Sequence, residues 1–453
     1  MPLGEKLARL PPLVRAERAS DPAGSPGVLP DRPTLDQLRD RIAQVLARGA
    51  GVRAPTAGPA SFETELDPPF FREETAWGPL DRAVRPTPHG HRVGAMPVWA
   101  ARTADPALLA LLALDPTLAQ LDPSRALYLD TETTGLSGGA GTVPFLVGLG
   151  FYEDDASPSG GGRFVVEQLL LKGLGDEAPI LEHLRRRIEA CSMLVTFNGK
   201  AFDLPLLRTR AVLNRVAPLA ERPHLDLLHV ARRLHKHRLA SCSLQTLESL
   251  ILGRERVGDV AGADIAAIYH HYLRSGDEGS LNPIVEHNAL DVISMFALVG
   301  LYGEPLEQWG DGGLVLAPSD LSAAAKVARR ARDLDRALVF AERSVTRGAG
   351  AVGHQARADV AKARGDKASA LLAYEAALAL ATAADAESLL ALSLRHELAK
   401  LYEHHARAYE RAIAVVAQGT TEAPDAQSAR LSRLVKKKDR AAVRPAKKRR
   451  TTA

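Results

Sequence analysis

Apolar and polar positions divide the chain into a middle part with strand patterns and a C-terminal part with helical patterns. An apolar stretch begins at Ala126, and the stretches VPFLVGLGFY and RFVVEQLLL follow it after Gly-rich turns. Three strands joined by turns predict an antiparallel meander. A helical pattern over 176–190 and a short buried strand over 192–197 come next. We therefore expect a central sheet of mixed direction with helices packed against it.

Beyond about Pro318 the strand patterns stop and Ala-rich helical patterns follow. Related phrases recur around Ala337, Ala370 and Ala412, and the first interval, 33 residues, is close to the tetratricopeptide period of about 34. We expect about three helix pairs stacked as a short solenoid. The second interval, 42 residues, is too long for that period, so a plain helical bundle is the alternative.

These patterns predict five regions. They are a flexible leader with one short helix after Thr34 (1–60), a loosely ordered wrap rich in turn-forming residues (61–115), the α/β domain (116–305), an all-α domain of tetratricopeptide-like helical repeats (318–420) and a disordered basic tail (421–453).

The composition, 46% hydrophobic and 25% charged, is that of an ordinary soluble protein. No apolar run approaches the roughly 20 residues of a membrane span, and the start lacks a secretory pattern. The two cysteines match no disulfide or zinc spacing, so we expect a cytoplasmic protein without a membrane partner. The segment 433–450 holds ten Lys or Arg and one Asp, a charge of +9 that leaves −5 for the rest of a chain with net charge +4. This segment either binds nucleic acid phosphates or is a solvated tail.

The apolar stretch that starts at Ala126 ends in two carboxylates, Asp130 and Glu132, which Thr133 follows at once. Residues i and i+2 of a strand point to the same face, so both carboxylates would lie side by side. Adjacent buried anions repel each other and lose solvation, and a divalent cation would compensate them. The alternative is an acidic strand end that turns into a solvated loop.

Two further acidic sites follow along the chain. Asp203 comes after the short buried strand, where a helix can begin, so it is either a cation ligand or an ordinary helix cap. His287 and Asp291 lie four residues apart on one face of a largely apolar helix that Asn282 could cap. As an isolated pair, they would be explained by mutual pairing on a half-exposed face.

Taken in order, these motifs resemble the DEDD superfamily of 3′→5′ exonucleases, which has the RNase H-like fold. They resemble most closely its bacterial YprB-like branch, in which such a domain is joined to tetratricopeptide repeats. The stretches that carry the resemblance are LDTETTGLSGGAGTVPFLVGLG, LVTFNGKAFDLPLL, HLDLLHVARRL, SCSLQTLE and HNALDVISM. The resemblance implies an α/β RNase H-like domain followed by an all-α helical-repeat domain.

For the site, the resemblance implies that four carboxylates hold two divalent cations, Mg²⁺ or Mn²⁺: Asp130, Glu132, Asp203 and Asp291. Such ions prefer oxygen ligands, and a pair can stabilise the attacking and the leaving oxygen of a phosphodiester displacement. His287 is then the candidate general base. The superfamily's histidine class places its His five residues before the last Asp and its tyrosine class places a Tyr four before. His287 has the tyrosine spacing.

Candidate substrate contacts are Asn198 and Thr133, which lie next to the acidic motifs. Phe202 either stacks on a base or packs in the core. Asp226 is either a further acidic residue of the site or a hydrogen-bonding residue within the fold. The basic run over 231–238 either follows a phosphate backbone or forms a solvated helix face.

The predicted function is metal-dependent 3′→5′ hydrolysis of nucleic acid from a single-stranded 3′ end. The direction and the exonuclease mode rest on the resemblance alone. One alternative is a structure-directed endonuclease with the same site. Another is an inactive nucleic-acid-binding scaffold whose repeats recruit a protein partner.

Overall fold

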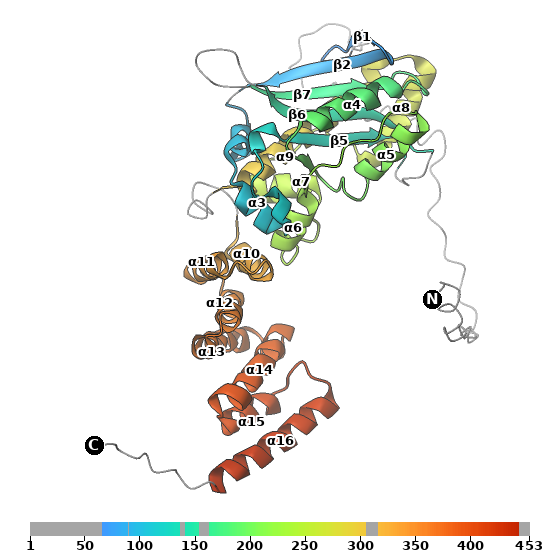
Figure 1. Cartoon of the computed structure of the whole chain (residues 1–453). Coiled ribbons are helices and arrows are strands. Elements are labelled where there is room, and N and C mark those ends of the chain that lie inside the picture. The colour runs from blue at the N-terminus through green and yellow to red at the C-terminus, as the bar shows by residue number, and fades with distance from the viewer. Residues whose placement is uncertain (1–65, 89, 136–140, 154–162, 305–315, 444–453) are drawn as a thin grey trace, which may run out of the picture.

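The computed structural model describes residues 66–88, 90–135, 141–153, 163–304 and 316–443, which form an α/β domain and a C-terminal helical region (Figure 1). The leader helix expected after Thr34 lies outside these residues. The strands are β1 (Phe71–Thr75), β2 (Gly78–Thr87), β3 (Arg92–Val93), β4 (Met96–Pro97), β5 (Leu127–Thr133), β6 (Pro144–Glu153), β7 (Arg163–Leu170), β8 (Leu194–Thr196) and β9 (His224–Asp226).

The helices of the α/β domain are α3 (Pro106–Ala113), α4 (Ala178–Ala190), α5 (Asp203–Leu213), α6 (Leu227–His235), α7 (Leu244–Leu247), η5 (Glu248–Leu252), α8 (Gly262–Ser275) and α9 (Asn282–Tyr302). Those of the helical region are α10 (Pro318–Arg330), α11 (Leu334–Thr346), α12 (Ala351–Ala363), α13 (Lys367–Ala384), α14 (Leu389–Leu401), η8 (Tyr402–Ala406), α15 (Tyr409–Ala417) and α16 (Pro424–Val443). Short 3-10 turns lie at Val98–Thr103, Pro116–Leu118, Pro123–Arg125 and Glu278–Leu281.

The central sheet has seven strands in the order β1-β2-β7-β6-β5-β8-β9. β5, β6 and β7 are antiparallel neighbours, so the predicted meander is confirmed. β8 pairs in parallel with both β5 and β9. The sheet therefore has mixed direction with helices packed against it, and a separate all-helical region follows, as the sequence predicts.

The prediction of a loosely ordered wrap over 61–115 is wrong for its middle part, which extends the sheet. β1 pairs with β2, and β2 pairs with β7 along seven residues. Two prolines, Pro79 and Pro86, lie within β2. Proline lacks the N–H that a strand ladder uses, so their presence concealed this strand in the sequence.

Strand β5 separates two hydrophobic clusters. Leu127 and Leu129 face the cluster that includes α4, α5 and α8. Tyr128 faces α9, where its ring stacks on Phe296 with the ring centroids 3.4 Å apart. Since side chains alternate along a strand, the residues at positions 130 and 132 share the face of Tyr128 and point toward α9.

Helix α9 is a core helix of the α/β domain and packs on β5, β6 and β7. Among the described residues, the stretch from Glu278 to Tyr302 is the one helix long and apolar enough to cross a membrane, and 78% of its apolar window is buried inside the protein. Its apolar character is therefore explained by packing. Asn282 does not cap this helix. Its side-chain oxygen accepts the N–H of Asp67 at 2.9 Å instead.

In the helical region, each helix packs on the next one along the chain, and α10 also packs on α12. Such neighbour-to-neighbour stacking is typical of solenoids. Ala337, Ala370 and Ala412 are fully buried where helices meet. The tetratricopeptide-like assignment stays a prediction. Helices α10, α11 and α12 share the large core of the α/β domain, whereas α13 to α16 form a second core to which α12 also contributes Ala358 and Ala361.

The prediction of a disordered tail from residue 421 is wrong for Pro424–Val443, which form α16. The buried carboxylate of Glu403 pairs with three basic residues of this helix, Arg430, Arg433 and Lys437, at 2.8–2.9 Å. Part of the basic charge of this segment therefore fixes the helix to α14–η8. Residues 444–453 lie outside the described part of the chain.

Candidate active site

The five predicted site residues come from three elements. Asp130 and Glu132 lie near the end of β5, Asp203 is the first residue of α5, and His287 and Asp291 lie one turn apart on α9. Glu132 and Asp203 are buried, whereas Asp130 and Asp291 are partly exposed. The cluster thus lies at the end of the strand with one side open to solvent.

Three of the four carboxylates accept a hydrogen bond from a neighbouring side chain. Asn288 Nδ2 donates to Asp130 Oδ2 at 2.9 Å. The hydroxyl of Thr131 donates to Asp203, and the guanidinium of Arg256 donates to Asp291.

Thr131 lies on the opposite face of β5 from Asp130, because side chains alternate along a strand, so Asp203 reaches the strand end from the other side of the sheet. Held in this way, the side chains do not converge on one point. Within the described ranges, no group of three or more His, Cys, Asp or Glu side chains is arranged to hold a metal ion.

The four carboxylates nevertheless influence one another strongly. Burial, and then the charges of Asp291 and Asp203, raise the pKa of Glu132 to about 8. Burial, and then Asp291 and Glu132, raise the pKa of Asp130 well above its ordinary value. Burial also raises the pKa of Asp203 to about 6 and raises that of Asp291.

Each of these anions is destabilised by burial or by its neighbours, and an added cation would relieve both effects. Four oxygen-only side chains are the donor set that hard divalent cations prefer. The chemistry of these residues therefore fits a divalent metal.

Arg256 supplies the positive charge at this cluster. This residue lies in the segment between η5 and α8, and its side chain is only 4% exposed. Nε and Nη2 each donate to Glu248 at 2.6 Å, and Nη1 donates to Asp259 at 3.0 Å. With its bond to Asp291, Arg256 connects three carboxylates.

His287 is oriented by a second carboxylate. Its Nδ1 lies 2.7 Å from Asp259 Oδ1, and its Nε2 lies 3.8 Å from Asp291 Oδ2. Burial opposes protonation of His287, but the hydrogen bond to Asp259 and the charge of Asp291 outweigh it, so the pKa of His287 is raised. A carboxylate on one ring nitrogen fixes the orientation of the ring and makes the other nitrogen a better proton acceptor. Nε2 is therefore directed to the carboxylate cluster.

Asn288 is fixed from behind by a glycine and a glutamine. Gln168 Nε2 donates to Asn288 Oδ1 at 2.9 Å, which leaves the amide nitrogen of Asn288 for Asp130. Gly148 pairs with Asp130 on β5 and with Gln168 on β7. A Cβ at Gly148 would lie 2.3 Å from Asn288 Oδ1, so this position leaves no room for a side chain.

The weaker sequence candidates take structural positions. Asp226 accepts the N–H groups of Asn198 at 2.9 Å, Lys200 at 3.1 Å and Leu228 at 3.1 Å, so it is a hydrogen-bonding residue that caps α6. It fixes the turn before Asp203, in which Asn198 has φ 71°. The Thr133 hydroxyl donates to the carbonyl of Gly135 at 2.9 Å. Substrate contact by Asn198 and Thr133 stays a prediction.

Phe202 is partly buried, and it is not among the residues of the three hydrophobic clusters found in the described part of the chain. The alternative in which Phe202 packs in the core is therefore not supported. Sequence reasoning also missed Arg256, Asp259 and Asn288. Asn288 is adjacent to His287, but the segment that holds Arg256 and Asp259 has no periodicity that could have indicated them.

Comparison with known proteins finds similarity over the elements that carry these residues. The family model described as RNase_H superfamily matches residues 127–302, a range that begins at β5 and ends with α9. Residues 127–302, which are less than half of the chain, are therefore similar to the RNase H superfamily. Over 174 residues the chain is 40% identical to a protein of Bacillus subtilis (strain 168) titled uncharacterized protein YprB. That match covers 38% of this chain and 40% of the relative, so it spans about two-fifths of each protein.

Proposed function

We propose that this protein is a metal-dependent nuclease that removes nucleotides from the 3′ end of a nucleic acid strand with two divalent cations, Mg²⁺ or Mn²⁺. One observation carries the proposal: four carboxylates from β5, α5 and α9 come within electrostatic reach of one another inside the region that is similar to the RNase H superfamily. RNase H-like nucleases usually use divalent metals. When bound, such ions stabilise the negative charge that develops on the attacking and leaving oxygens.

The ligands would be Asp130, Glu132, Asp203 and Asp291. To hold a cation, Asp291 has to exchange the guanidinium of Arg256 for the ion, and Asp203 has to share the oxygen that now accepts from Thr131. The side chain of Asn288 keeps one oxygen of Asp130 in place and leaves the other oxygen available.

In the reaction, a water oxygen attacks the phosphorus, and the bond from phosphorus to the 3′ oxygen of the preceding nucleotide breaks. We assign proton transfer from that water to Nε2 of His287, since this nitrogen faces the cluster and Nδ1 is held by Asp259. The leaving 3′ oxygen takes a proton from solvent. General base catalysis of this kind contributes about 10²–10⁴-fold.

The test uses purified full-length protein with Mg²⁺ or Mn²⁺ and single- and double-stranded DNA and RNA labelled at the 5′ end. Wild type is expected to produce a ladder that shortens from the 3′ end, and EDTA is expected to abolish it. Asp130→Asn and Asp291→Asn should each lower the rate by about 10³-fold, because metal stabilisation is worth several kcal/mol. Asp335→Asn, at a side chain 91% exposed in the helical region, is the matched control.

Equal nucleolysis by wild type and both site variants would exclude this site as the source of activity. Cleavage of a circular single strand would identify an endonuclease, since a circle has no 3′ end. Tight strand binding without cleavage under any metal would identify a binding scaffold.

A further inference from the structure

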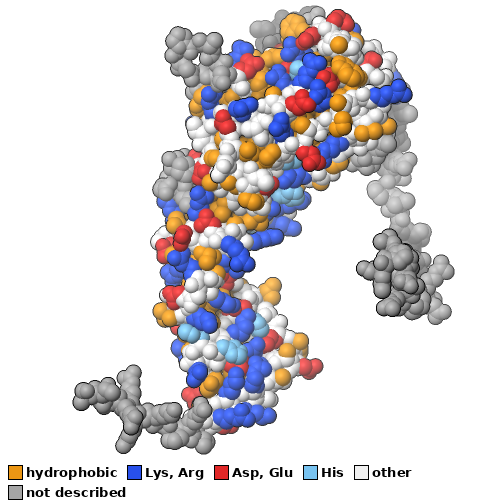
Figure 2. All heavy atoms as spheres, viewed as in Figure 1, with side chains coloured by type: hydrophobic (Ala, Val, Ile, Leu, Met, Phe, Trp, Pro, Cys, Tyr) orange, Lys and Arg blue, Asp and Glu red, His pale blue; other side chains and the backbone are white. Residues whose placement is uncertain are grey.

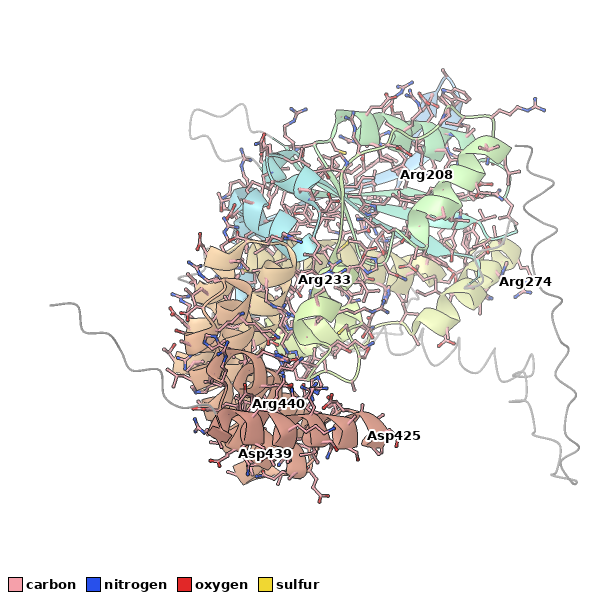
Figure 3. All side chains as sticks on the ribbon, turned by 60° about the horizontal axis from the view of Figure 1, so that its bottom comes forward. Arg208, Arg233, Arg274, Asp425, Asp439 and Arg440 are labelled. Atoms are coloured by element: carbon pink, nitrogen blue, oxygen red, sulfur yellow. The ribbon has the colours of Figure 1, made fainter. Side chains whose placement is uncertain are left out.

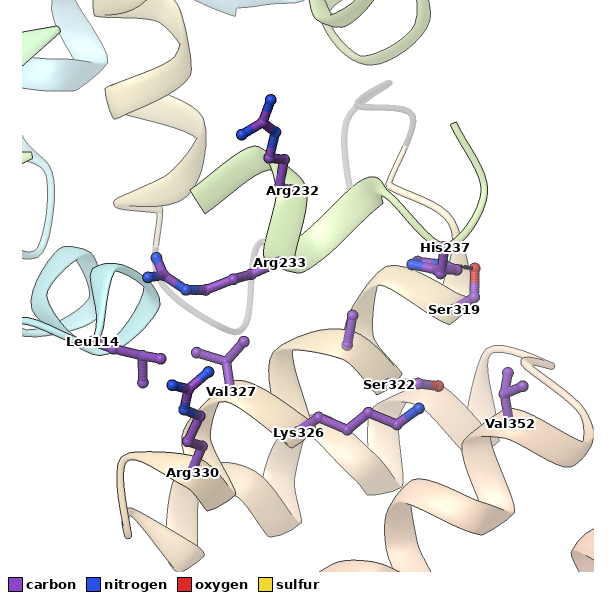
Figure 4. Close-up of a pocket in the computed structure, with 11 residues that line it drawn as sticks. Leu114, Arg232, Arg233, His237, Ser319, Ser322, Lys326, Val327, Arg330 and Val352 are labelled. Atoms are coloured by element: carbon purple, nitrogen blue, oxygen red, sulfur yellow. Dashed lines mark hydrogen bonds between the residues drawn. The ribbon is translucent and has the colours of Figure 1, made fainter. Parts of the chain in front are cut away.

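A second charged site lies where the α/β domain meets the helical region. A cavity of about 350 Å³ opens between α6, the end of α3 and α10 (Figure 4). We call it the junction cavity. Five basic side chains line it together with smaller residues: Arg232, Arg233, His237, Lys326 and Arg330. No Asp or Glu is among its lining residues in the described part of the chain.

Two arginines of the junction cavity, Arg233 and Arg330, have no carboxylate paired with them among the described residues, whereas His237 lies 3.7 Å from Asp320 Oδ1 and burial lowers its pKa. Arg238, the last residue of the basic run over 231–238, pairs with the fully buried Asp320 at 2.7 Å and therefore stabilises the contact between the turn after α6 and helix α10. Arg233 donates only to the carbonyl of Leu112 at 3.2 Å, and none of the carboxylates in the described ranges pairs with Arg233 or Arg330. Burial, and then the charge of Arg330, lower the pKa of Arg233. Within the described part of the chain, the charges of these two arginines therefore have no carboxylate paired with them at the cavity.

The side chains of Arg233 and Arg330 point to the same part of the cavity (Figure 4). Arg233 extends from α6 toward the end of α3, and Arg330 extends from α10 to the same place (Figure 4). Arg233 lies at the boundary between the two parts of the molecule (Figure 3). Lys and Arg side chains gather on the surface at this boundary (Figure 2). A ligand in the cavity would therefore touch both parts of the protein.

The junction cavity is fixed relative to the sheet. Leu234 on α6 and Leu321 and Ala325 on α10 belong to the same hydrophobic core, so the two helices that carry the cations form one packed unit. Helix α6 begins directly after Asp226, the residue that holds the turn before Asp203. At 1.5 Å per residue, Arg233 lies about 10 Å along the helix from Asp226. His235 on α6 lies 3.2 Å from the hydroxyl of Tyr302, the last residue of α9, which is about 16 Å along that helix from Asp291, so a strand of several nucleotides would have to span this distance.

We propose that the junction cavity binds backbone phosphates of the nucleic acid strand whose end lies at the carboxylate cluster. This inference rests on the proposed function. Guanidinium groups bind phosphate through paired N–H donors, and backbone phosphates supply most of the affinity of proteins for nucleic acids. The volume is within the range of ordinary ligand sites, so a nucleotide-sized anion can enter. Contact from α6 and α10 together gives the helical region a part in holding the substrate.

Fluorescence anisotropy with labelled poly-dT or poly-U in EDTA tests the proposal without cleavage. The cavity variant is Arg233→Gln/Arg330→Gln. The matched control, Lys236→Gln/Arg329→Gln, removes two exposed charges from α6 and α10 or their ends, outside the cavity lining. The cavity variant should bind a long strand about tenfold more weakly and lower the salt dependence of log K by about 1.4, given roughly 0.7 for each of two phosphate contacts. The loss should be smaller for a dinucleotide. Circular dichroism checks that both variants fold.

Equal loss in the two variants, or an unchanged salt slope in the cavity variant, would overturn the proposal. If inorganic phosphate raises the melting temperature of wild type but not that of the cavity variant, and both bind the strand with the same affinity, then the cavity binds a free anion instead. Preferential binding of an acidic peptide would likewise overturn it. If strands bind through Arg233 and Arg330 but no metal supports cleavage, the proposed function fails and the cavity assignment stands.

Discussion

The carboxylate cluster and the junction cavity both contain arginines, but they use them differently. Arg256 in the cluster is 4% exposed and connects Glu248, Asp259 and Asp291. Arg330 in the junction cavity lies on an exposed helix face without a carboxylate partner among the described residues. A buried charge must be compensated inside the protein, whereas a charge at an open cavity is solvated by water and can be paired by a ligand. We therefore infer that the paired Arg256 stabilises the fold and the carboxylate cluster, and that Arg330, which has no carboxylate partner in the described part of the chain, is available for ligand binding.

The largest expected difference is in stability. Arg256→Met leaves the carboxylate of the buried Glu248 without its charged partner, with only the Ser294 hydroxyl donating to it among the described residues, and should lower the free energy of unfolding by about 3–5 kcal/mol. Arg330→Met should change it by no more than about 0.5 kcal/mol, as is usual at an exposed site. Denaturant unfolding of both variants measures the contrast. Similar losses in the two variants would show that Arg256 is not a structural counter-charge.

The orientation of His287 is expected to have the next largest effect. Asp259→Asn should lower kcat by about 10–100-fold, the usual cost of removing such a supporting carboxylate, with little change in KM. Asp277→Asn, at a carboxylate that makes no capping bond, is the control. His287→Ala should abolish the further effect of Asp259→Asn, because the two residues would act as one unit. Additive losses would place Asp259 outside this role.

Stability of the metal-free protein should fall as pH rises from about 6.5 to 8.5. With a pKa of about 8, folded Glu132 keeps a proton that the unfolded chain has already lost, so the folded state binds more protons in this range. His224, whose pKa burial lowers to about 4, is neutral in the folded state here, and in the unfolded chain it loses its proton at about pH 6.5, so the decline is read between about pH 7.5 and 8.5. Thermal unfolding in EDTA measures the decline, and Mg²⁺ should reduce it. A decline of the same size in Glu132→Gln would exclude this residue as its cause.

The smallest expected effect is a gain in stability when one carboxylate of the cluster is removed. Asp130→Asn removes a carboxyl group whose ionised form is destabilised by burial and by its neighbours, while the carbonyl oxygen of the new amide can still accept from Asn288. In EDTA the melting temperature should rise by roughly 2–4 °C for about 1 kcal/mol in a domain of this size. A lower melting temperature at neutral pH would show that the carboxylates do not repel one another.

The sequence determined the features that depend on short spacings. The strand period placed Asp130 and Glu132 on one face, and the helix period placed His287 one turn from Asp291, because backbone geometry repeats every two or 3.6 residues. Apolar stretches separated by Gly-rich turns likewise predicted β5, β6 and β7 and their antiparallel order. Such local patterns depend only on residues close together in the sequence, so they can be recognised without the rest of the fold.

Only the tertiary structure decided which distant groups meet. Asn288 reaches Asp130 across 158 residues of chain, and Arg256 reaches Asp291 across 35. The proline-containing strand β2 became part of the sheet because β7 was there to pair with it. The junction cavity exists because α6 and α10 pack into one core, which brings Arg233 and Arg330 together. Pairing between distant segments depends on how surfaces fit after folding, and no short period in the sequence encodes it.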